Sequence, residues 1–245
     1  MIARTTAVIE PGGVLGELCC APPLTLRQVR SEDPERCELR LVGTAAGPLP
    51  GDDLTMCLRL KPGARAALRA TGSHLAQGRA GAGRAATLSV RAEVGNGARL
   101  SAEPGPLIVC HGSRVDVRVE LALGPAAAVQ WRELIVLGRT GEPSGQAALR
   151  WDVTRGGRPL FRQFVDLADA FAGRTLVAGR RVLASALLAG LSGQPRTVVA
   201  SPQAVAQLVA EDTLLVTVLA DDAASATRQL DELCNRACDD RDPGE

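Results

Sequence analysis

Cys110 and His111 are neighbouring residues whose side chains could take part in metal chemistry. The stretch EPGPLIVCHGSRVDVRVELAL (103–123) places them between a proline-containing bend and an alternating run. A thiolate and an imidazole together would accept zinc, copper or nickel. Consecutive side chains of an extended strand point to opposite faces, so the pair cannot hold one ion there without a turn or bulge. We therefore expect Cys110 in the core and His111 at a turn.

Catalytic constellations are scarce in the rest of the sequence. Its only histidines are His74 and His111, which excludes a three-histidine zinc site and leaves few places for a Ser-His-Asp triad. No G-x-x-x-x-G-K-[ST] motif occurs, which excludes a P-loop nucleotidase. A hydrolase built on Cys110–His111 would need a third, orienting group that the sequence does not supply. We predict that the protein is not an enzyme and has no tightly bound cofactor.

The cysteines favour packing over ligation. There are 7, with no C-x₂-C pair that would nucleate a zinc ribbon. Cys234 and Cys238 lie four residues apart, on the face of an expected helix that also carries Leu230 and Leu233. The N-terminus lacks the apolar region of a secretory signal, so we expect reduced thiols and a cytoplasmic protein.

Three carboxylates stand at places where a β-scaffold would bring turns together. Asp52 follows Gly51 directly before an alternating run, Glu133 lies in QWRELIVLGR, and Glu142 lies in GRTGEPSG. Taken alone, each is most simply a solvated turn carboxylate or the partner of an arginine.

A period of two dominates residues 36–165 and predicts half-buried strands. LTMCLRL (54–60) and TLSVRAEV (87–94) alternate apolar and polar residues, and short glycine-bearing turns join such runs. Three turns of the form x-G-x-A, near Gly63, Gly97 and Gly124, indicate a weak quasi-repeat of hairpins. The predicted fold is mainly β, with stacked antiparallel sheets that are β-helix-like or sandwich-like. Residues 1–165 form this β-rich domain.

The pattern changes after residue 165. Helical spacing predicts a helix over 175–191 and another over 201–212, with short buried strands over 196–201 and 213–220. An amphipathic helix over 221–240 follows. We predict a small α/β subdomain over 166–236 and a disordered tail over 237–245.

Composition excludes some classes of partner. The formal net charge is +1 and the aromatic fraction is 2%, which argues against a nucleic-acid binder. No apolar run is long enough for a membrane span.

Four segments, taken in order, resemble the UreD family of urease accessory proteins, called UreH in some bacteria. They are GPLPGDDLTMCLRLKPGARAALRATGSHLA (47–76), GARLSAEPGPLIVCHGSRVDVRVELALG (97–124), RELIVLGRTGEPSG (132–145) and VTRGGRPLFRQ (153–163). The resemblance implies a non-catalytic role in nickel insertion. It implies binding to the helical accessory protein UreF, recruitment of the GTPase UreG through it, and docking on apo-urease.

The resemblance also implies a passage through the β-domain that conducts Ni²⁺ transiently and holds no tight metal site. Asp52, Ser73, Glu133 and Glu142 match family motif positions and would line or gate that passage. Arg139 would orient Glu142 or hold its turn. Cys110 and His111 would serve at an entrance. A β-rich module that binds a protein or carbohydrate, without a metal role, is the alternative interpretation.

Overall fold

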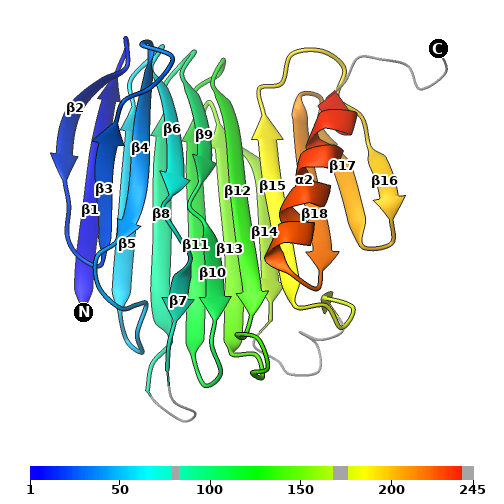
Figure 1. The fold of residues 1–245 in the computed structure, drawn as a ribbon. Coiled ribbons are helices and arrows are strands. Elements are labelled where there is room, and N and C mark those ends of the chain that lie inside the picture. The colour runs from blue at the N-terminus through cyan, green and yellow to red at the C-terminus, as the bar shows by residue number, and fades with distance from the viewer. Residues whose placement is uncertain (79–82, 168–175, 239–245) are drawn as a thin grey trace.

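The chain winds into two stacked β-sheets with a helix against the outer face of one of them (Figure 1). A computed structural model describes residues 1–78, 83–167 and 176–238. The first sheet has 7 strands and the second has 11. The prediction of a mainly β fold with stacked, β-helix-like sheets is therefore confirmed.

The first sheet runs in the order β14-β13-β11-β8-β5-β1-β2. Its strands are β1 (Ile2–Glu10), β2 (Val14–Cys19), β5 (Asp53–Leu60), β8 (Ala86–Val94), β11 (Arg114–Leu123), β13 (Gln146–Arg155) and β14 (Arg158–Asp166).

The second sheet runs in the order β16-β17-β18-β15-β12-β9-β6-β4-β3, and β10 pairs with both β12 and β7. Its strands are β3 (Leu24–Val29), β4 (Arg36–Gly43), β6 (Arg65–Ala70), β7 (His74–Ala76), β9 (Arg99–Glu103), β10 (Pro106–Val109), β12 (Ala128–Leu137), β15 (Val182–Ala189), β16 (Val198–Ser201), β17 (Ala204–Ala210) and β18 (Thr213–Ala220).

Strand direction is where the sequence prediction is wrong. In the first sheet β1, β5, β8, β11 and β13 pair in parallel, and in the second sheet β4, β6, β9 and β12 do so too. The chain passes from one sheet to the other after most strands, so consecutive strands stack instead of pairing. Antiparallel pairs are found at the ends, in β1–β2, β3–β4, β13–β14 and from β12 onward through β15–β18.

The three x-G-x-A turns are the arches of these coils and not hairpins. In each arch the alanine amide closes the turn on the carbonyl three residues earlier, at Lys61, Gly95 and Gly124. The arches also bond to one another, as in Arg99 N to Ala64 O at 2.9 Å and Ala128 N to Ala98 O at 2.9 Å. The quasi-repeat in the sequence thus marks the solenoid step.

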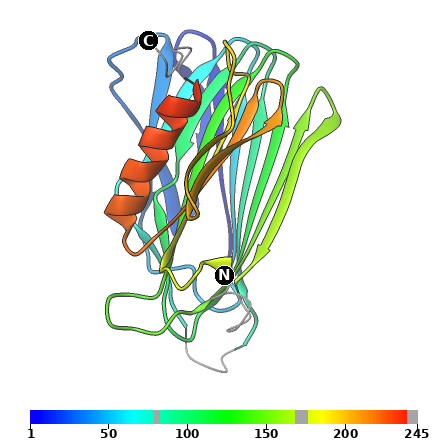
Figure 2. The same cartoon turned by 90° about the vertical axis from the view of Figure 1, so that its right-hand side faces the viewer.

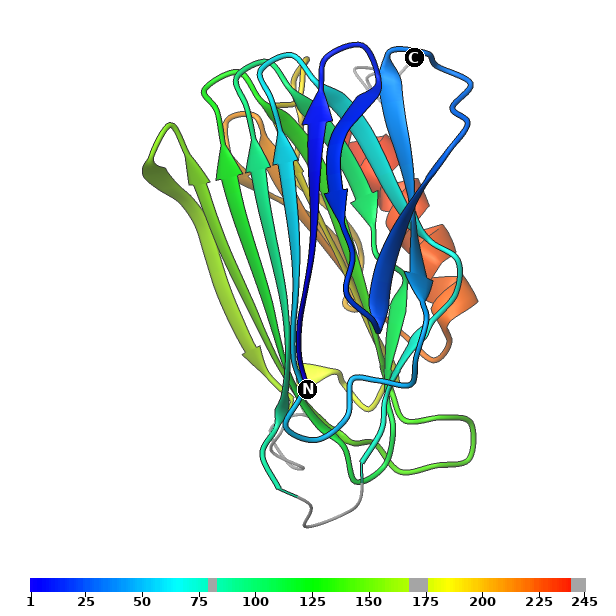
Figure 3. The same ribbon diagram turned by 90° about the vertical axis from the view of Figure 1, so that its left-hand side faces the viewer.

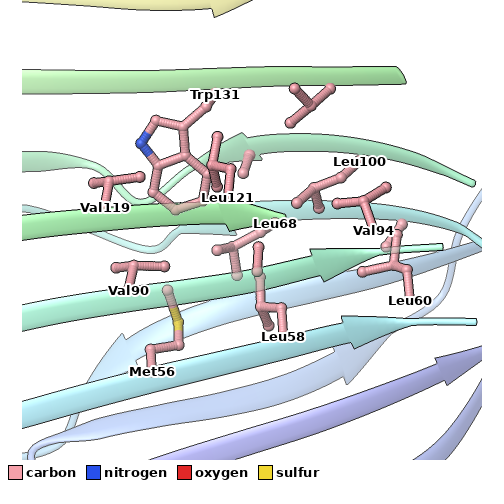
Figure 4. Packing of buried hydrophobic residues seen from close by; sticks show 14 of the residues in the cluster. Met56, Leu58, Leu60, Leu68, Val90, Val94, Leu100, Val119, Leu121 and Trp131 are labelled. Atoms are coloured by element: carbon pink, nitrogen blue, oxygen red, sulfur yellow. The ribbon is translucent and has the colours of Figure 1, made fainter. Parts of the chain in front are cut away.

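Alternation places one face of each coil strand in an aliphatic core between the sheets. Figure 4 shows Trp131 of the second sheet packed among Val119 and Leu121 of the first, with Leu68 and Leu100 nearby. Burial of this much apolar side-chain surface is the main favourable term for a chain with so few aromatics.

The helix predicted over 175–191 is wrong, because residues 182–189 form β15. All eight residues of β15 are buried. One face packs on the inter-sheet core through Leu187, and the other packs beneath α2 (Ala223–Cys238) through Ala184 and Ala186. A strand buried on both faces shows no alternation, so its pattern cannot be told from that of a buried helix.

The helix predicted over 201–212 is also wrong. Pro202 and Gln203 form the turn between β16 and β17, where Gln203 N donates to Ser201 Oγ at 3.2 Å. The strands expected near 196–201 and 213–220 are present as β16 and β18. Because β15 pairs with β12, the C-terminal segment continues the second sheet.

The last helix is confirmed as α2. Asp222 caps its start, since Ser225 N donates to Asp222 Oδ1 at 2.8 Å. The buried face of α2 includes Leu230, Leu233 and Cys234. Figure 2 shows α2 against the outer face of the second sheet, and Figure 3 shows the opposite side, where β1, β2 and β3 lie. Of the predicted tail, residues 239–245 lie outside the described part of the chain.

Within the described ranges, no helix has the length and apolar character needed to cross a bilayer.

Candidate functional site

Glu133 is a buried carboxylate in the space between the two sheets. It lies on β12, next in the inward row after Trp131, and is 9% exposed. Trp151 on β13 of the opposite sheet donates from its Nε1 to Glu133 Oε2 at 2.6 Å. The predicted site residue is therefore tied across the core and is not a surface turn carboxylate.

Burial changes the acidity of Glu133. The loss of water raises its pKa to about 7, and the hydrogen bond from Trp151 opposes that rise. A carboxyl with this pKa is partly protonated near neutral pH, and it can exchange a proton for a cation at little cost.

A small cavity of about 40 Å³ adjoins Glu133 between the sheets, and it is also lined by His74 and Trp131. His74 Nε2 and Trp131 Nε1 are both buried, and neither has a hydrogen-bond partner among the described residues. Burial lowers the pKa of His74, against an opposing backbone hydrogen bond with Pro104. Unpaired buried nitrogen atoms are rare in proteins, and this volume exceeds the roughly 10–15 Å³ that one water needs.

The second sheet has a break beside Glu133. β12 pairs with β9 as far as Trp131–Ala102, and with β10 from Leu134–Pro106 onward. Pro104 has no amide hydrogen to donate, and Gly105 has φ +84°. These two residues interrupt the parallel ladder opposite Glu133.

A groove on the far side of the break lies under α2. It has a volume of about 110 Å³, and Arg132, Thr227 and Leu230 are among the residues that line it. The groove and the inner cavity share Gly105, Glu133 and Leu134. Glu133 thus stands between the inter-sheet space and the surface beneath α2.

Ser73 lies near the same break. It is exposed in the bend that precedes β7, and β7 pairs with β10 beginning at His74–Leu107. A Cβ on Gly105 would come within 2.8 Å of Gly72 O, so the two backbones are in close contact there. Two of the predicted residues, Ser73 and Glu133, therefore belong to one region.

Asp52 lies elsewhere, in the loop directly before β5 and beside the N-terminus, which is marked in Figure 1. Its side chain is 5% exposed. It accepts from the N-terminal ammonium of Met1 at 2.7 Å and from Leu49 N at 2.9 Å. Asp52 fixes the loop before β5 and the start of β1.

Glu142 belongs to the loop between β12 and β13. It accepts from Arg139 Nε at 2.8 Å, from Arg139 N at 3.0 Å and from His111 N at 3.1 Å. These donors, led by the Arg139 side chain, lower the pKa of Glu142 to about 2. Arg181 Nη2 donates to the carbonyl of Arg139 at 2.6 Å and to that of Glu142 at 3.1 Å. Glu142 therefore connects its own loop, which contains Arg139, to the turn that contains His111.

Cys110 and His111 face apart, as expected. Cys110 is buried and burial raises the pKa of its thiol, whereas His111 is exposed in the turn after β10. Ser113 Oγ donates to the Cys110 carbonyl at 2.6 Å, which fixes this turn. The two side chains do not converge on a common ligand.

The structure therefore separates the predicted residues into two groups. Glu133 and Ser73 lie at the break in the second sheet. Asp52, Cys110, His111, Arg139 and Glu142 instead lie in the loops that lead from the second sheet into β5, β11 and β13 of the first. Sequence reasoning missed His74, Trp131 and Trp151 as partners of the first group. The scarcity of histidine and tryptophan could have drawn attention to them. Across the ranges 1–78, 83–167 and 176–238, no three His, Cys, Asp or Glu residues cluster as metal ligands.

Comparison with known proteins decides the family. The family model for the UreD urease accessory protein matches residues 9–242. The chain belongs to the UreD family. The UreD match extends through the C-terminal segment, well beyond the four motifs between residues 47 and 163.

Relatives named as urease accessory proteins are similar along most of the chain. "Urease accessory protein UreD 3" of Streptomyces griseus is 32% identical over 253 residues, with 98% of each chain covered. "Urease accessory protein UreD" of Parafrankia sp. is 36% identical, covering 80% of this chain and 74% of the relative. The UreD protein of Cereibacter sphaeroides is 35% identical, covering 79% and 74%. A role accessory to urease follows for this chain.

Proposed function

We propose that this UreD-family protein takes part in nickel insertion into apo-urease by giving Ni²⁺ a transient route through its β-solenoid. Nickel is cargo in this role and not a resident cofactor. The observation that carries the proposal is the placement of Glu133 at the break in the second sheet, between the inter-sheet cavity and the groove beneath α2.

The donor set at the break suits passage better than storage. A divalent cation needs oxygen or nitrogen donors to replace part of its hydration shell. Glu133 offers a carboxylate and His74 offers an imidazole nitrogen without a partner among the described residues. Two donors hold a cation weakly, and weak binding is what transfer to another protein requires.

The other predicted residues act on this route in different ways. Ser73 offers a hydroxyl beside the break. Asp52 and Glu142 hold loops that lead into first-sheet strands, β5 and β13 respectively, because their oxygens accept hydrogen bonds from the chain. Arg139 orients Glu142, and the turn of Cys110 and His111 forms an entrance beside the loop of Glu142.

Energy and delivery come from partners in this proposal. The sequence has no nucleotide-binding loop, so a UreG-like GTPase supplies GTP hydrolysis and binds through a UreF-like helical protein. The complex docks on apo-urease in the cytoplasm. It contains no nucleic acid and no membrane component.

Replacing Glu133 tests the role. Glu133→Gln keeps the shape and the acceptor for Trp151 but removes the negative charge. The variant and the wild type are each expressed in a host that lacks its own UreD-family gene. We expect the variant to give at least about tenfold less urease activation and less nickel in purified urease than wild type, because the negative charge attracts the cation. Glu120→Ala, an exposed carboxylate on β11, is the matched control and should activate fully.

Assembly must be measured beside activity. Co-purification with the UreF-like partner and apo-urease should be unchanged for Glu133→Gln. Full activation by this variant would remove Glu133 from the mechanism. Failure of the wild-type chain to bind either protein would favour a binding module without a metal role.

A further inference from the structure

The outer faces of the two sheets carry different charge. Along β3, β4, β6, β9 and β12 the outward side chains include seven arginines and two carboxylates. The arginines are Arg27, Arg36, Arg40, Arg65, Arg69, Arg99 and Arg132, and the carboxylates are Glu38 and Glu103. We call this surface the arginine face; Figure 1 views it, with α2 along one border.

The outer face of the first sheet is balanced instead. Its inner strands β5, β8, β11 and β13 present arginines and carboxylates in equal number. These are Arg59, Arg91, Arg114, Arg118 and Arg150 with Asp53, Glu93, Asp116, Glu120 and Asp152. Since the net charge of the chain is only +1, the positive charge of the arginine face is a local feature.

The arginines of this face are in register across parallel strands. Arg36 pairs with Arg65, and Arg65 pairs with Arg99. Four residues further along β4 and β6, Arg40 pairs with Arg69, and Arg27 of the antiparallel strand β3 pairs with Arg40 to complete a second row. Neighbouring strands lie about 4.8 Å apart, and like charges directly opposite each other destabilise a sheet. Fold stability does not explain these rows.

Neutralisation within the face is incomplete. Glu38 lies 3.4 Å from Arg36 Nε and 3.5 Å from Arg40, and Asp33 lies 3.4 Å from Arg65, which are long contacts. Arg69 pairs with Glu103, and Arg132 pairs with Glu103 and Asp231, but neither Arg27 nor Arg99 has an ion pair among the described residues. Donors of several guanidinium groups therefore remain available to a ligand.

A groove marks where the ligand would lie. It has a volume of about 270 Å³, and its lining includes Arg36, Arg65, Arg99, Gln130 and Leu191. Small and apolar residues such as Ala128 and Leu188 also line it. A planar guanidinium above an apolar floor suits a carboxylate carried on a polypeptide, because carboxylate forks match its donors and side-chain stems cover the floor.

We propose that the arginine face is a docking surface for an acidic segment of a partner protein. Charge complementarity is the basis. The chain has few aromatic residues for base stacking, and the apolar residues that line the groove suit side-chain stems, so a polypeptide fits better than a nucleic acid. This surface does not depend on the cation route through Glu133.

A peptide-binding measurement on the full chain tests the proposal. The probe is a fluorescein-labelled peptide of ten glutamates, followed by anisotropy at low and at physiological salt. The triple variant Arg36→Glu, Arg65→Glu, Arg99→Glu should bind at least about tenfold more weakly than wild type. Salt should weaken wild-type binding, because the contacts are ionic.

The matched control changes net charge by the same amount on the other sheet. Arg114→Glu, Arg118→Glu, Arg150→Glu should shift the affinity less than about twofold, since those arginines alternate with carboxylates. Equal weakening by both triples, or an unchanged affinity in the first, would overturn the proposal. So would tighter binding of a single-stranded oligonucleotide of matched charge.

Folding of the variants is checked by circular dichroism. If the glutamate triple does not fold, the Arg36→Gln, Arg65→Gln, Arg99→Gln variant removes three positive charges without adding repulsion. Its affinity for the peptide should still fall at least about threefold. Wild-type affinity in the folded glutamine variant would equally refute the docking surface.

Discussion

Trp151 on β13 donates a 2.6 Å hydrogen bond to Glu133 on β12, and this contact joins the two sheets through the middle of the core. The partners come from different sheets, and both are buried. A charged or polar pair in such a place costs stability unless each member has its partner. The protonation of Glu133 and the packing of the two sheets around Trp151 therefore depend on each other.

Trp151→Phe should destabilise the protein. The variant keeps most of the ring volume but leaves Glu133 Oε2 without its donor. An unsatisfied buried acceptor costs about 1–3 kcal/mol. Urea unfolding followed by circular dichroism measures the loss. Trp131→Phe is a useful comparison, because Trp131 Nε1 has no partner within the described residues and the change should cost less.

Glu133 should make the stability of the fold depend on pH. Its pKa rises from 4.5 to about 7 on folding, so the native state binds more protons between these values. The contribution of Glu133 to the free energy of unfolding is therefore fully present below pH 4.5. It falls by about 3 kcal/mol as pH rises through 7. Glu133→Gln should flatten this part of the curve of unfolding free energy against pH. Parallel curves for wild type and Glu133→Gln would contradict a raised pKa at Glu133.

Glu142 should behave in the opposite sense, because its pKa is lowered to about 2. Its stabilising contacts are present above pH 4.5 and are lost as pH falls toward 2. Glu142→Gln should speed amide hydrogen exchange at Arg139 and His111, whose N–H groups it accepts. Exchange in β5, which adjoins neither loop, is the internal control. Unchanged exchange at both amides would show that the contact is not formed in solution.

Gly124→Ala should destabilise the stacked arches. A Cβ there would meet the Asn96 backbone at 2.6 Å in the preceding coil, which cannot move without disturbing its own arch. We expect a loss of about 1–3 kcal/mol. Gly72→Ala is the control, since nothing lies within 4 Å of the added carbon. Similar thermal midpoints for the two variants would argue against close packing of the coils.

Leu230→Ala should loosen α2 from the second sheet. Leu230 is 2% exposed and packs in the cluster between α2 and β15–β18. Large-to-small changes in such a cluster cost about 2–5 kcal/mol. Thr227→Ala, one turn earlier and exposed, should cost under about 1 kcal/mol. The ion pair of Arg132 with Asp231 at 2.5 Å would remain in both variants.

The sequence was informative where one face of a strand meets water. β11 alternates strictly between buried valines or leucines and outward residues that are mostly charged, so its extent could be predicted from residues 114–123. β15 could not, because water meets neither of its faces. Alternation also says nothing of strand direction, since parallel and antiparallel strands bury the same residues. Strand direction is set by the arches, because each arch carries the chain from one sheet to the other instead of turning it back within the same sheet.

The candidate site was harder to predict than the fold. Asp52, Glu133 and Glu142 are indicated by their places in the sequence and Ser73 by the family resemblance, but their grouping depends on contacts between distant segments. His74 meets Glu133 at a cavity only because β7 pairs beside β10, and β10 beside β12. The arginine rows are likewise invisible in one strand and emerge only from register across several.

The antiparallel hairpins at the ends of the stack limit how far it can grow. Parallel coils alone would present an open rung to which any similar strand could add, as in fibrous assemblies. Here β2, β3, β14 and β16 reverse direction and occupy those rungs. A further coil therefore could not continue the parallel register at these edges.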